Sequence, residues 1–286
     1  MEYAIELKGV TKRYKHFTLE NLDLRIPRGF VTGLVGPNGA GKTTLIRLIM
    51  NLLRRDAGQI HVLGRDLDRD EAQIKAAVGF VYDDFNFYQE RRAATLAKVF
   101  AASYADWDQA RFEKLVRTFD LPLNKRIKRL SRGMRMKFSL ALALSHEAEL
   151  ILMDEPTAGL DPVFRRELLD QLAEILLDEQ RSILFSTHIT SDLDRIADHV
   201  VILDEGRVLL SASKLEIEES WGLVRVGEWT PHPDLPVRGV REGRHGTEIL
   251  TDDVVTLREH IGRDAVVERP TLEDILLLLT KGGSHV

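Results

Sequence analysis

The sequence contains no cysteine among its 286 residues. This absence excludes disulfide bonds, thiolate catalysis and zinc sites built on cysteine, and it is compatible with a reducing compartment such as the cytosol. Long apolar runs are also missing, since no run exceeds that at 275–279, whereas crossing a bilayer takes roughly 20 residues. The first residues, MEYAIELKG, lack the basic flank and apolar core of a secretion signal. We therefore expect a chain that does not cross a membrane.

The sequence also lacks a large excess of either charge. It has 40 Lys and Arg against 45 Asp and Glu, a formal net charge of −5, and a pI near 6.0. This balance argues against a protein whose affinity comes from neutralising nucleic-acid phosphates, so we expect no nucleic-acid partner. The composition, 44% hydrophobic and 30% charged, is typical of a globular protein.

Short apolar segments alternate with amphipathic ones along most of the chain. Alternating residues predict an early antiparallel hairpin over 4–7 and 18–26. Short apolar strands with helical crossovers predict a parallel sheet covered on both faces. The expected strands span 30–35, 58–63, 78–82, 149–153 and 182–186, the expected helices span 43–53, 162–178 and 190–197, and a later hairpin pairs 200–203 with 207–210.

Two regions depart from this alternation. Residues from about 85 to 146 are mostly helical in pattern, with one break near Pro122. After Ser213 the character changes again, because 229–236 is rich in proline and is typical of a loop between short strands. We expect the second region to be a small α+β domain, and no catalytic motif is found in it.

Helix caps are also predicted in that last region. Asp252 is expected to cap a helix over 253–261. Thr271, with Asp274 three residues later, is expected to cap a final helix over 272–280. Strands are expected at 223–226 and 236–240.

A glycine-rich string, GPNGAGKTT, follows the strand expected at 30–35 and satisfies the pattern G-x4-G-K-[ST] through Gly36, Gly41, Lys42 and Thr43. Glycines let backbone N–H groups turn toward phosphate oxygens without a Cβ in the way, and the following helix adds its positive N-terminus. Lys42 would reach the β- and γ-phosphates, and the Thr43 hydroxyl would bind Mg²⁺. An accidental glycine-rich turn is the alternative, but the strand before the loop and the helix after it favour a phosphate site. The remaining residues of this candidate site are Pro37, Asn38, Gly39, Ala40 and Thr44.

An acidic pair, Asp154 and Glu155, follows the buried strand expected at 149–153. Ligand sites of open α/β sheets lie at such strand ends. Asp154 would support Mg²⁺, and Glu155 would polarise the attacking water. A solvated loop is the alternative for an isolated Asp-Glu pair, and the glycine-rich loop upstream favours the catalytic interpretation.

A second small motif, LSRGM, spans 130–134. It places Ser131 and Gly133 at the start of a helix, where they could bind the phosphates of a nucleotide held by another copy of the glycine-rich loop. One phosphate site and one further phosphate clamp on a single chain predict a dimer that closes around ATP.

Together these motifs resemble those of the ATP-binding subunits of ABC transporters, over roughly residues 2–212. By this resemblance, 36–44 is similar to the Walker A motif, 150–155 to the Walker B motif with its catalytic glutamate, and 158–161 to the D-loop, so that Asp161 lies at the dimer interface. The resemblance implies that His188 contacts the γ-phosphate and that Tyr14 stacks on adenine, with Phe17 as a competitor for that role.

The resemblance implies an α/β fold of the P-loop NTPase type, with a parallel-sheet core, an antiparallel β subdomain and a helical subdomain at about 85–146. The ATPase domain would span 1–213 and the small α+β domain 214–286. The chain would be an ATPase with ATP and Mg²⁺ as cofactors, and Lys42, Glu155 and His188 would be catalytic. It would work as a homodimer or as a heterodimer with a related subunit, on the cytoplasmic face of the membrane. A separate transmembrane permease subunit would contact the region around Tyr88, Arg91 and Arg92, as in bacterial exporters.

Two positions depart from the family pattern. The signature is usually LSGGQ, and Arg132 and Met134 replace two of its residues here. Arg132 could reach a phosphate or the ribose or extend into solvent, and we favour solvent. Asp83 stands where the family has a glutamine that binds Mg²⁺ and links the site to the membrane partner. An aspartate can still bind a hard cation, so ATP binding is not threatened, and the strength of coupling stays open.

Two other functions stay open at this point. The first is an ABC ATPase that does not serve a membrane protein, but such relatives carry coiled coils, zinc modules or paired cassettes that this sequence lacks. The second is a regulatory subunit that binds ATP with negligible hydrolysis. Glu155 and His188 argue against the second function, and substitution of Glu155 distinguishes it from a motor.

Overall fold

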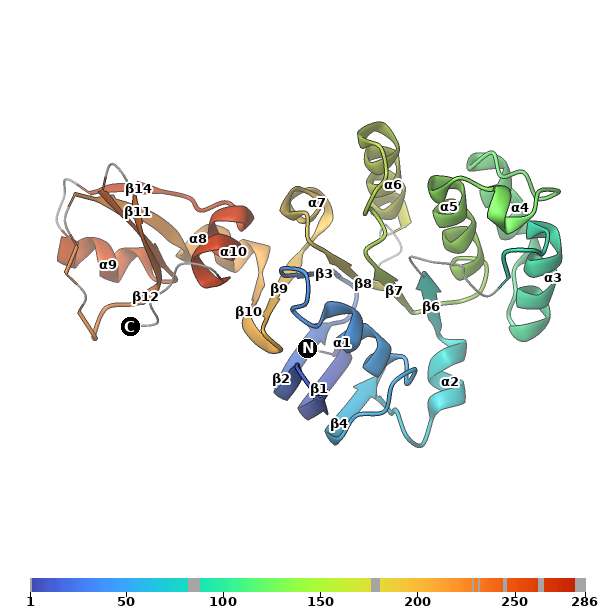
Figure 1. Ribbon diagram of the computed structural model, residues 1–286, viewed down its shortest axis with the longest axis horizontal. Coiled ribbons are helices and arrows are strands. Elements are labelled where there is room, and N and C mark those ends of the chain that lie inside the picture. Colours follow the sequence, from blue (N-terminus) through green and yellow to red (C-terminus); the bar gives the residue numbers. More distant parts are fainter. Residues whose placement is uncertain are drawn as a thin grey trace.

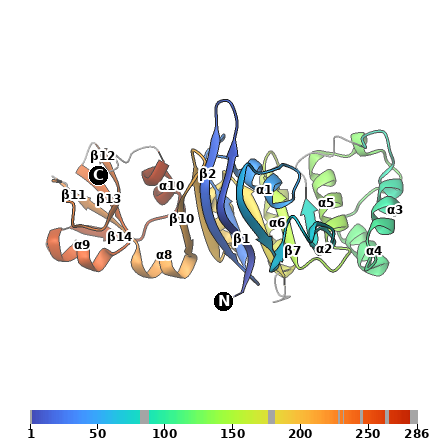
Figure 2. The ribbon, with the colours of Figure 1, turned by 90° about the horizontal axis from the view of Figure 1, so that it is seen from below.

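The computed structural model describes residues 2–81, 88–175, 181–227, 229–230, 232–243, 246–261 and 265–280. These residues form an elongated molecule (Figure 1), with helices α3 to α5 at one end and the C-terminal sheet at the other. Figure 2 shows the same arrangement from below, with the N-terminal strands between the two ends.

The central layer is a six-stranded sheet with the order β10-β9-β3-β8-β7-β6. All neighbouring strands in it are parallel except β10 and β9, which form the expected hairpin. Its strands are β3 (Val31–Val35), β6 (Val78–Val81), β7 (Leu150–Asp154), β8 (Ser182–Thr187), β9 (His199–Asp204) and β10 (Arg207–Ser213).

Both faces of this sheet are covered, as the apolar strands predict. Leu152 and Leu184 pack on one side with α1 (Lys42–Ile49), whereas Ile151 and Ile183 pack on the other side with α5 to α7. Adjacent residues of a strand point to opposite faces, so a strand that is apolar throughout must be covered twice. The helices of the second side are α5 (Arg132–Ala143), α6 (Pro162–Ile175) and α7 (Thr190–Ile196).

An antiparallel sheet with the order β2-β1-β4-β5 covers the outer side of α1. It contains the hairpin expected from the sequence, extended by two more strands. Its strands are β1 (Tyr3–Arg13), β2 (Thr18–Pro27), β4 (Ala57–Val62) and β5 (Arg65–Asp66). Helix α1 is shorter than the expected 43–53, because Asn51 adopts a left-handed backbone conformation with φ of 52° just after the last turn.

The described residues after β6, from 88 onward, are mostly helical up to Ala143, as the sequence predicts. They contain α3 (Ala93–Ser103), α4 (Gln109–Thr118), the 3₁₀ turn η1 (Ile127–Arg129) and α5, and the expected break at Pro122 falls between α4 and η1. A short helix before β6, α2 (Glu71–Ala76), was not expected.

Residues after Ser213 form a third sheet with the order β12-β13-β11-β14. Its strands are β11 (Gly222–Val226), β12 (Val237–Gly243), β13 (Gly246–Thr251) and β14 (Val266–Glu268), and its helices are α8 (Lys214–Ser220), α9 (Val254–Ile261) and α10 (Leu272–Thr280). Helix α8 and strands β13 and β14 were not expected.

One predicted cap is confirmed and one is wrong. Thr271 and Asp274 exchange hydrogen bonds between side chain and backbone at the start of α10, as predicted. For α9, however, the cap is Asp253, whose carboxylate accepts from the Thr256 backbone N–H at 3.0 Å. Asp252 instead forms an ion pair with Arg238 of β12, a partner that the sequence does not show.

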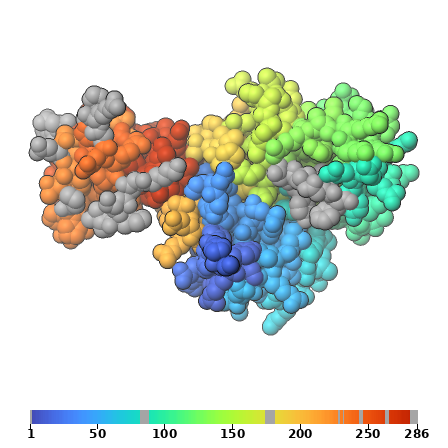
Figure 3. Space-filling view, in the orientation of Figure 1, coloured from blue at the N-terminus to red at the C-terminus, as the bar shows by residue number. Residues whose placement is uncertain are grey.

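Helix α10 joins the third sheet to the rest of the molecule. Leu272, Ile275 and Leu278 belong to the same buried apolar cluster as Ile196 of α7 and Trp221. Figure 3 shows the red α10 lying directly against the yellow part of the core. The last helix therefore packs on the helix that follows His188.

Candidate functional site

The glycine-rich loop leaves β3 at the carboxyl end of the parallel sheet and leads into α1. A Cβ at Gly36 would lie 2.0 Å from the backbone oxygen of Leu203, so only glycine fits where the loop crosses β9. Gly41 has φ of 109°, a backbone conformation that residues other than glycine rarely adopt. Its missing Cβ also leaves room for the Phe17 ring. The loop shape therefore depends on these glycines.

Lys42 is the first residue of α1, and only 6% of its side chain is exposed. Its Nζ donates hydrogen bonds to the carbonyl oxygens of Gly36 at 2.7 Å and Pro37 at 3.2 Å. The same atom lies 3.4 Å from Oε1 of Glu155. A buried ammonium group needs such acceptors, and the oxygens of a phosphate can serve in the same way.

Asp154 ends β7 and is paired in register with Ser186 of the neighbouring β8. Its Oδ1 accepts hydrogen bonds from the Thr43 hydroxyl at 3.2 Å and from the Ser186 hydroxyl at 2.7 Å. The Ser186 Oγ in turn accepts from the Glu155 backbone N–H at 2.9 Å. The structure thus brings Thr43 and Asp154 together, as expected.

Ser186 was missed in the sequence analysis. It links both acidic residues, and the signal that could have found it is its place at the end of a strand beside the one that carries Asp154.

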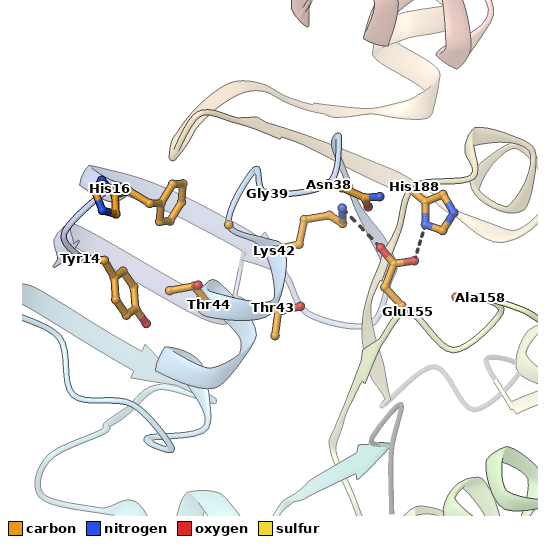
Figure 4. Close-up of a pocket in the computed structure, with 12 residues that line it drawn as sticks. Tyr14, His16, Asn38, Gly39, Lys42, Thr43, Thr44, Glu155, Ala158 and His188 are labelled. Carbon is orange, nitrogen blue, oxygen red and sulfur yellow. Dashed lines mark hydrogen bonds and ion pairs between the residues drawn. The ribbon is translucent and has the colours of Figure 1, made fainter. Parts of the chain in front are cut away.

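Glu155 lies between Lys42 and His188 (Figure 4). Its Oε2 is 2.8 Å from Nδ1 of His188, and its side chain is 17% exposed. Glu155 also has φ of 49°, an unusual value for a residue with a side chain. Such backbone strain costs about 1–3 kcal/mol and clusters at functional sites. The three residues predicted to be catalytic therefore meet around one carboxylate.

These residues line a cavity of about 800 Å³ that reaches from Glu155 and His188 to the turn between β1 and β2. Tyr14 and His16 form its far end, and the neighbouring Phe17 also lines the cavity. The Tyr14 and Phe17 rings are 6.4 Å apart between centroids and tilted by 34°, and Tyr14 is 46% exposed. Tyr14 is thus where an adenine ring could stack, and Phe17 lines the same cavity. His16 was missed, because an isolated histidine in a turn carries no motif.

The loop residues divide into two groups. Asn38, Gly39, Gly41, Lys42, Thr43 and Thr44 line the cavity. Gly36, Pro37 and Ala40 do not line it and instead maintain the loop: Gly36 and Pro37 accept from Lys42, and the Ala40 carbonyl accepts from the Gly206 backbone N–H at 3.1 Å.

Ser131 and Gly133 lie outside this cavity, at the N-terminus of α5. The Ser131 hydroxyl caps the helix by accepting from the Met134 backbone N–H at 3.2 Å. A Cβ at Gly133 would lie 2.8 Å from the Phe164 ring of α6. Within one chain, these two residues are therefore not brought to the glycine-rich loop.

Arg132 is exposed, yet it does not simply extend into solvent as we favoured. One of its guanidinium nitrogens lies 2.5 Å from the position that a Cβ at Gly159 would occupy, so the side chain contacts the 158–161 turn.

Asp161 also lies away from the cavity, and its carboxylate accepts from the Phe164 backbone N–H at 3.0 Å at the start of α6. Ala158, three residues earlier, does line the cavity. Asp83 lies outside the described residues.

The donors present fit a magnesium ion that is held mainly by substrate and water. Within the described ranges, no cluster of three or more His, Cys, Asp or Glu side chains could hold a metal. The hydroxyl of Thr43 and the carboxylate of Asp154, 3.2 Å apart, are hard oxygen donors. Mg²⁺ typically binds through one or two such groups together with phosphates and water.

Comparisons with known proteins show the family. The family model described as "ABC transporter" matches residues 19–158. Daunorubicin resistance ATP-binding protein DrrA3 of Streptomyces coeruleorubidus is 33% identical, over 99% of this chain and 98% of that protein. Nod factor export ATP-binding protein I of Neorhizobium galegae is 30% identical, over 97% and 85% respectively. A solved structure of an ATP-binding subunit of an ABC transporter superposes with a TM-score of 0.66 and 28% identity, over 75% of this chain and 92% of that chain.

The chain therefore belongs to the ATP-binding subunits of ABC transporters. It is a nucleotide-binding ATPase that powers a transporter, with the P-loop NTPase fold expected from its motifs. Among the helices that the structure describes, none is long and apolar enough to cross a bilayer.

Proposed function

We propose that the chain drives an exporter by closing as a dimer around two ATP molecules, with Ser131 and Gly133 of each chain completing the site of the other. The observation that carries this proposal is an asymmetry within one chain. Glu155 is held between Lys42 and His188 in the cavity, whereas Ser131 and Gly133 lie on another helix outside it. A second chain would supply the missing phosphate contacts.

The part of the glycine-rich loop that lines the cavity would bind the phosphates. Lys42 would exchange its carbonyl acceptors for the β- and γ-phosphate oxygens, and backbone N–H groups from Asn38 to Thr44 would donate to the same anion. The adenine ring would stack on Tyr14 at the far end of the cavity.

The metal would be Mg²⁺, held by Thr43 and Asp154, with Asp83 as a further ligand. Bound there, it would neutralise negative charge on the phosphates. Ser186 would keep Asp154 oriented, because its hydroxyl donates to the carboxylate at 2.7 Å.

Glu155 would accept a proton from the attacking water as the new bond to the γ-phosphorus forms and the bond to the bridging oxygen breaks. Such a general base contributes about 10²–10⁴ in rate. His188, which lies 2.8 Å from Glu155, would contact the γ-phosphate. Loss of the γ-phosphate removes the group that joins the two chains, so they separate, and this movement performs the work.

The partner would be a separate transmembrane subunit, and the chain would work at the cytoplasmic face of the membrane. Tyr88, Arg91 and Arg92 are exposed at the start of the helical segment and are candidates for this contact. The names of the two relatives, which refer to daunorubicin resistance and Nod factor export, support an exporter. We propose two domains, an ATPase domain at 1–213 and an α+β domain at 214–286, because a separate sheet begins after Ser213.

The test is light scattering on the purified Glu155→Gln chain with and without MgATP, alongside the ATPase activity of the wild type. We expect an ATP-dependent dimer and hydrolysis by the wild type only. The control is Glu155→Gln combined with Lys42→Ala, which should remain monomeric. If the wild type binds ATP tightly without hydrolysing it, the chain acts as a regulatory subunit and not as a motor. If the chain hydrolyses ATP as a monomer, the proposal of a site shared between two chains is wrong.

A further inference from the structure

A buried carboxylate outside the nucleotide cavity connects three parts of the site. Asp192 lies in the first turn of α7, and only 1% of its side chain is exposed. Its Oδ2 accepts from the Thr157 hydroxyl at 2.7 Å, and its Oδ1 accepts from Nε of Arg165 at 2.5 Å. Arg165 also donates to the Ser191 hydroxyl at 2.9 Å. Asp192 does not line the cavity, so it has no direct contact with a nucleotide there.

The two partners of Asp192 stand on either side of the turn that carries Asp161. Thr157 comes two residues after Glu155 and is itself buried, whereas Arg165 comes four residues after Asp161 in the first turn of α6. The Arg165 backbone N–H donates to the Asp161 carbonyl at 2.9 Å. A single carboxylate therefore fixes both ends of the segment between Glu155 and α6.

The same residue is linked through its backbone to the segment that carries His188. Asp192 follows His188 by four residues, and its backbone N–H donates to the Ile189 carbonyl at 3.2 Å. The Ile189 N–H donates to the Thr187 hydroxyl at 3.0 Å, so the short segment between β8 and α7 is held at both ends. A shift of Asp192 would move the backbone next to His188.

We propose that Asp192 is a positioning residue for ATP hydrolysis. Its carboxylate holds Glu155, the 158–161 turn and His188 in one arrangement without touching the nucleotide. The proposal rests on the roles proposed above for Glu155 and His188. Binding of ATP by the glycine-rich loop does not depend on this carboxylate, whereas alignment of the water and of the residues that cross to the partner does.

The cost of disturbing this carboxylate follows from burial. A buried charge is tolerated only when it is paired and hydrogen-bonded, as Asp192 is. Arg165 is 25% exposed and can be solvated if Asp192 is neutralised, but the Thr157 hydroxyl is buried and cannot. Because catalysis depends on alignment within about 1 Å, a small displacement of the turn lowers the rate far more than the affinity.

The chain offers a matched control for this carboxylate. Asp170 of α6 forms an ion pair with Arg195 of α7, so it joins the same two helices. That pair is on the surface, with its side chains 53% and 37% exposed, and neither residue is next to the 158–161 turn. Replacing Asp170 removes an ion pair between α6 and α7 while leaving the turn held.

The experiment compares Asp192→Asn, Thr157→Val, Thr157→Ser and Asp170→Asn in the full chain, measuring kcat, KM, ATP affinity and Tm. We expect Asp192→Asn and Thr157→Val to lower kcat about tenfold or more, with KM and ATP affinity changed less than about threefold. Thr157→Ser keeps the hydroxyl and should retain activity, as should Asp170→Asn. If Asp192→Asn fails to fold, the kcat of Thr157→Val decides whether the proposal holds, because this substitution removes a single hydroxyl.

Two results would overturn the inference. One is a kcat within about twofold of wild type in both Asp192→Asn and Thr157→Val. The other is an equal loss in Asp170→Asn, which would mean that the two helices merely need to be joined. Glu155→Gln, measured in parallel, separates this failure from failure of the proposed function: if it leaves turnover intact, the roles of the site residues are wrong and not only that of Asp192.

Discussion

The N-termini of α1 and α5 are both predicted to bind phosphate, but the structure gives them different surroundings. Helix α1 begins after Gly41, which has no side chain to cap the first turn, and it opens into a cavity that contains Lys42 and Glu155. Helix α5 begins after Ser131, which caps its own helix, and it lies outside that cavity. An uncapped helix N-terminus that opens into a cavity can bind an anion through its backbone N–H groups. In the proposed dimer, a second chain would bring a phosphate to the capped and exposed start of α5.

The largest expected effect is a difference in ATP affinity between variants at the start of α1 and at the start of α5. Lys42→Ala should weaken ATP binding by the single chain by about 10- to 100-fold, because a charged hydrogen bond contributes roughly 1.5–3 kcal/mol. Ser131→Ala should leave this affinity unchanged, since Ser131 lies outside the cavity. Titration with a fluorescent ATP analogue measures both. A comparable loss in the two variants would contradict the difference between the helix starts.

Mixing these two variants tests whether the start of α1 in one chain and the start of α5 in another chain form one site in a dimer. Each variant alone should hydrolyse little ATP, because each of its sites lacks one component. In a mixture, hybrid dimers contain one intact site, so roughly a quarter of the wild-type rate should return if chains pair at random and sites act independently. Steady-state ATPase assays on mixtures in varied ratio measure this. Recovery would be absent if each chain completed its own site.

A smaller effect is expected from Gly133→Ala, which alters the α5 start alone. The new Cβ would lie 2.8 Å from the Phe164 ring, so the ring or one of the two helices must shift. Such overpacking costs about 1–3 kcal/mol in the free energy of unfolding, which urea denaturation measures. Combining it with Phe164→Ala should relieve the clash. If the double variant is no more stable than Gly133→Ala after allowing for Phe164→Ala alone, the contact does not explain the glycine.

The smallest effect concerns the region beyond the other end of α5, where His146 stacks on Tyr104 at 4.0 Å between centroids. Burial lowers the pKa of His146 below its ordinary 6.5. As pH falls below about 6.5, the unfolded chain therefore takes up a proton that the folded chain resists. The stability that neutral His146 contributes is complete above that pH and is lost below it, by at most about 1.4 kcal/mol per pH unit.

His146→Phe keeps the stacked ring and should flatten this dependence between pH 6.5 and 5, as measured by urea denaturation at several pH values. It should leave ATP binding unchanged, because His146 does not line the nucleotide cavity. His199, whose pKa burial also lowers, should retain its own dependence in that variant. An unchanged slope would show that His146 is protonated equally in both states.

The order of strands and helices in the core was largely predictable, because apolar strands and amphipathic helices differ in period. Weakly patterned elements were not: α2, α8, β13 and β14 are short or polar, and tertiary contacts decide them. The cap of α9 was predicted one residue too early, since Asp252 and Asp253 are the same residue type and the sequence alone does not distinguish them. Only the nearby Arg238 separates them, by pairing with Asp252.

For the site, sequence motifs pointed to Lys42, Thr43, Asp154 and Glu155, and the resemblance to the family added His188. Neither identified Ser186 or Asp192, which carry no motif and act through neighbours. Ser186 faces Asp154 only because β7 and β8 pair in register. Asp192 reaches Thr157 and Arg165 only because α7 packs against α6.

By itself, the sequence determined that this protein holds a glycine-rich loop before a helix, an acidic pair at a strand end and the LSRGM motif, because these depend on residue types at fixed local spacing. Tertiary structure alone decided which of them meet. Parallel pairing brings the ends of β3, β7 and β8 to one edge of the sheet, so that Lys42, Glu155 and His188 surround one cavity. Ser131 and Gly133 start α5 beside Phe164 of α6 and lie outside that cavity, since contacts between distant segments are set by how helices and strands pack in three dimensions.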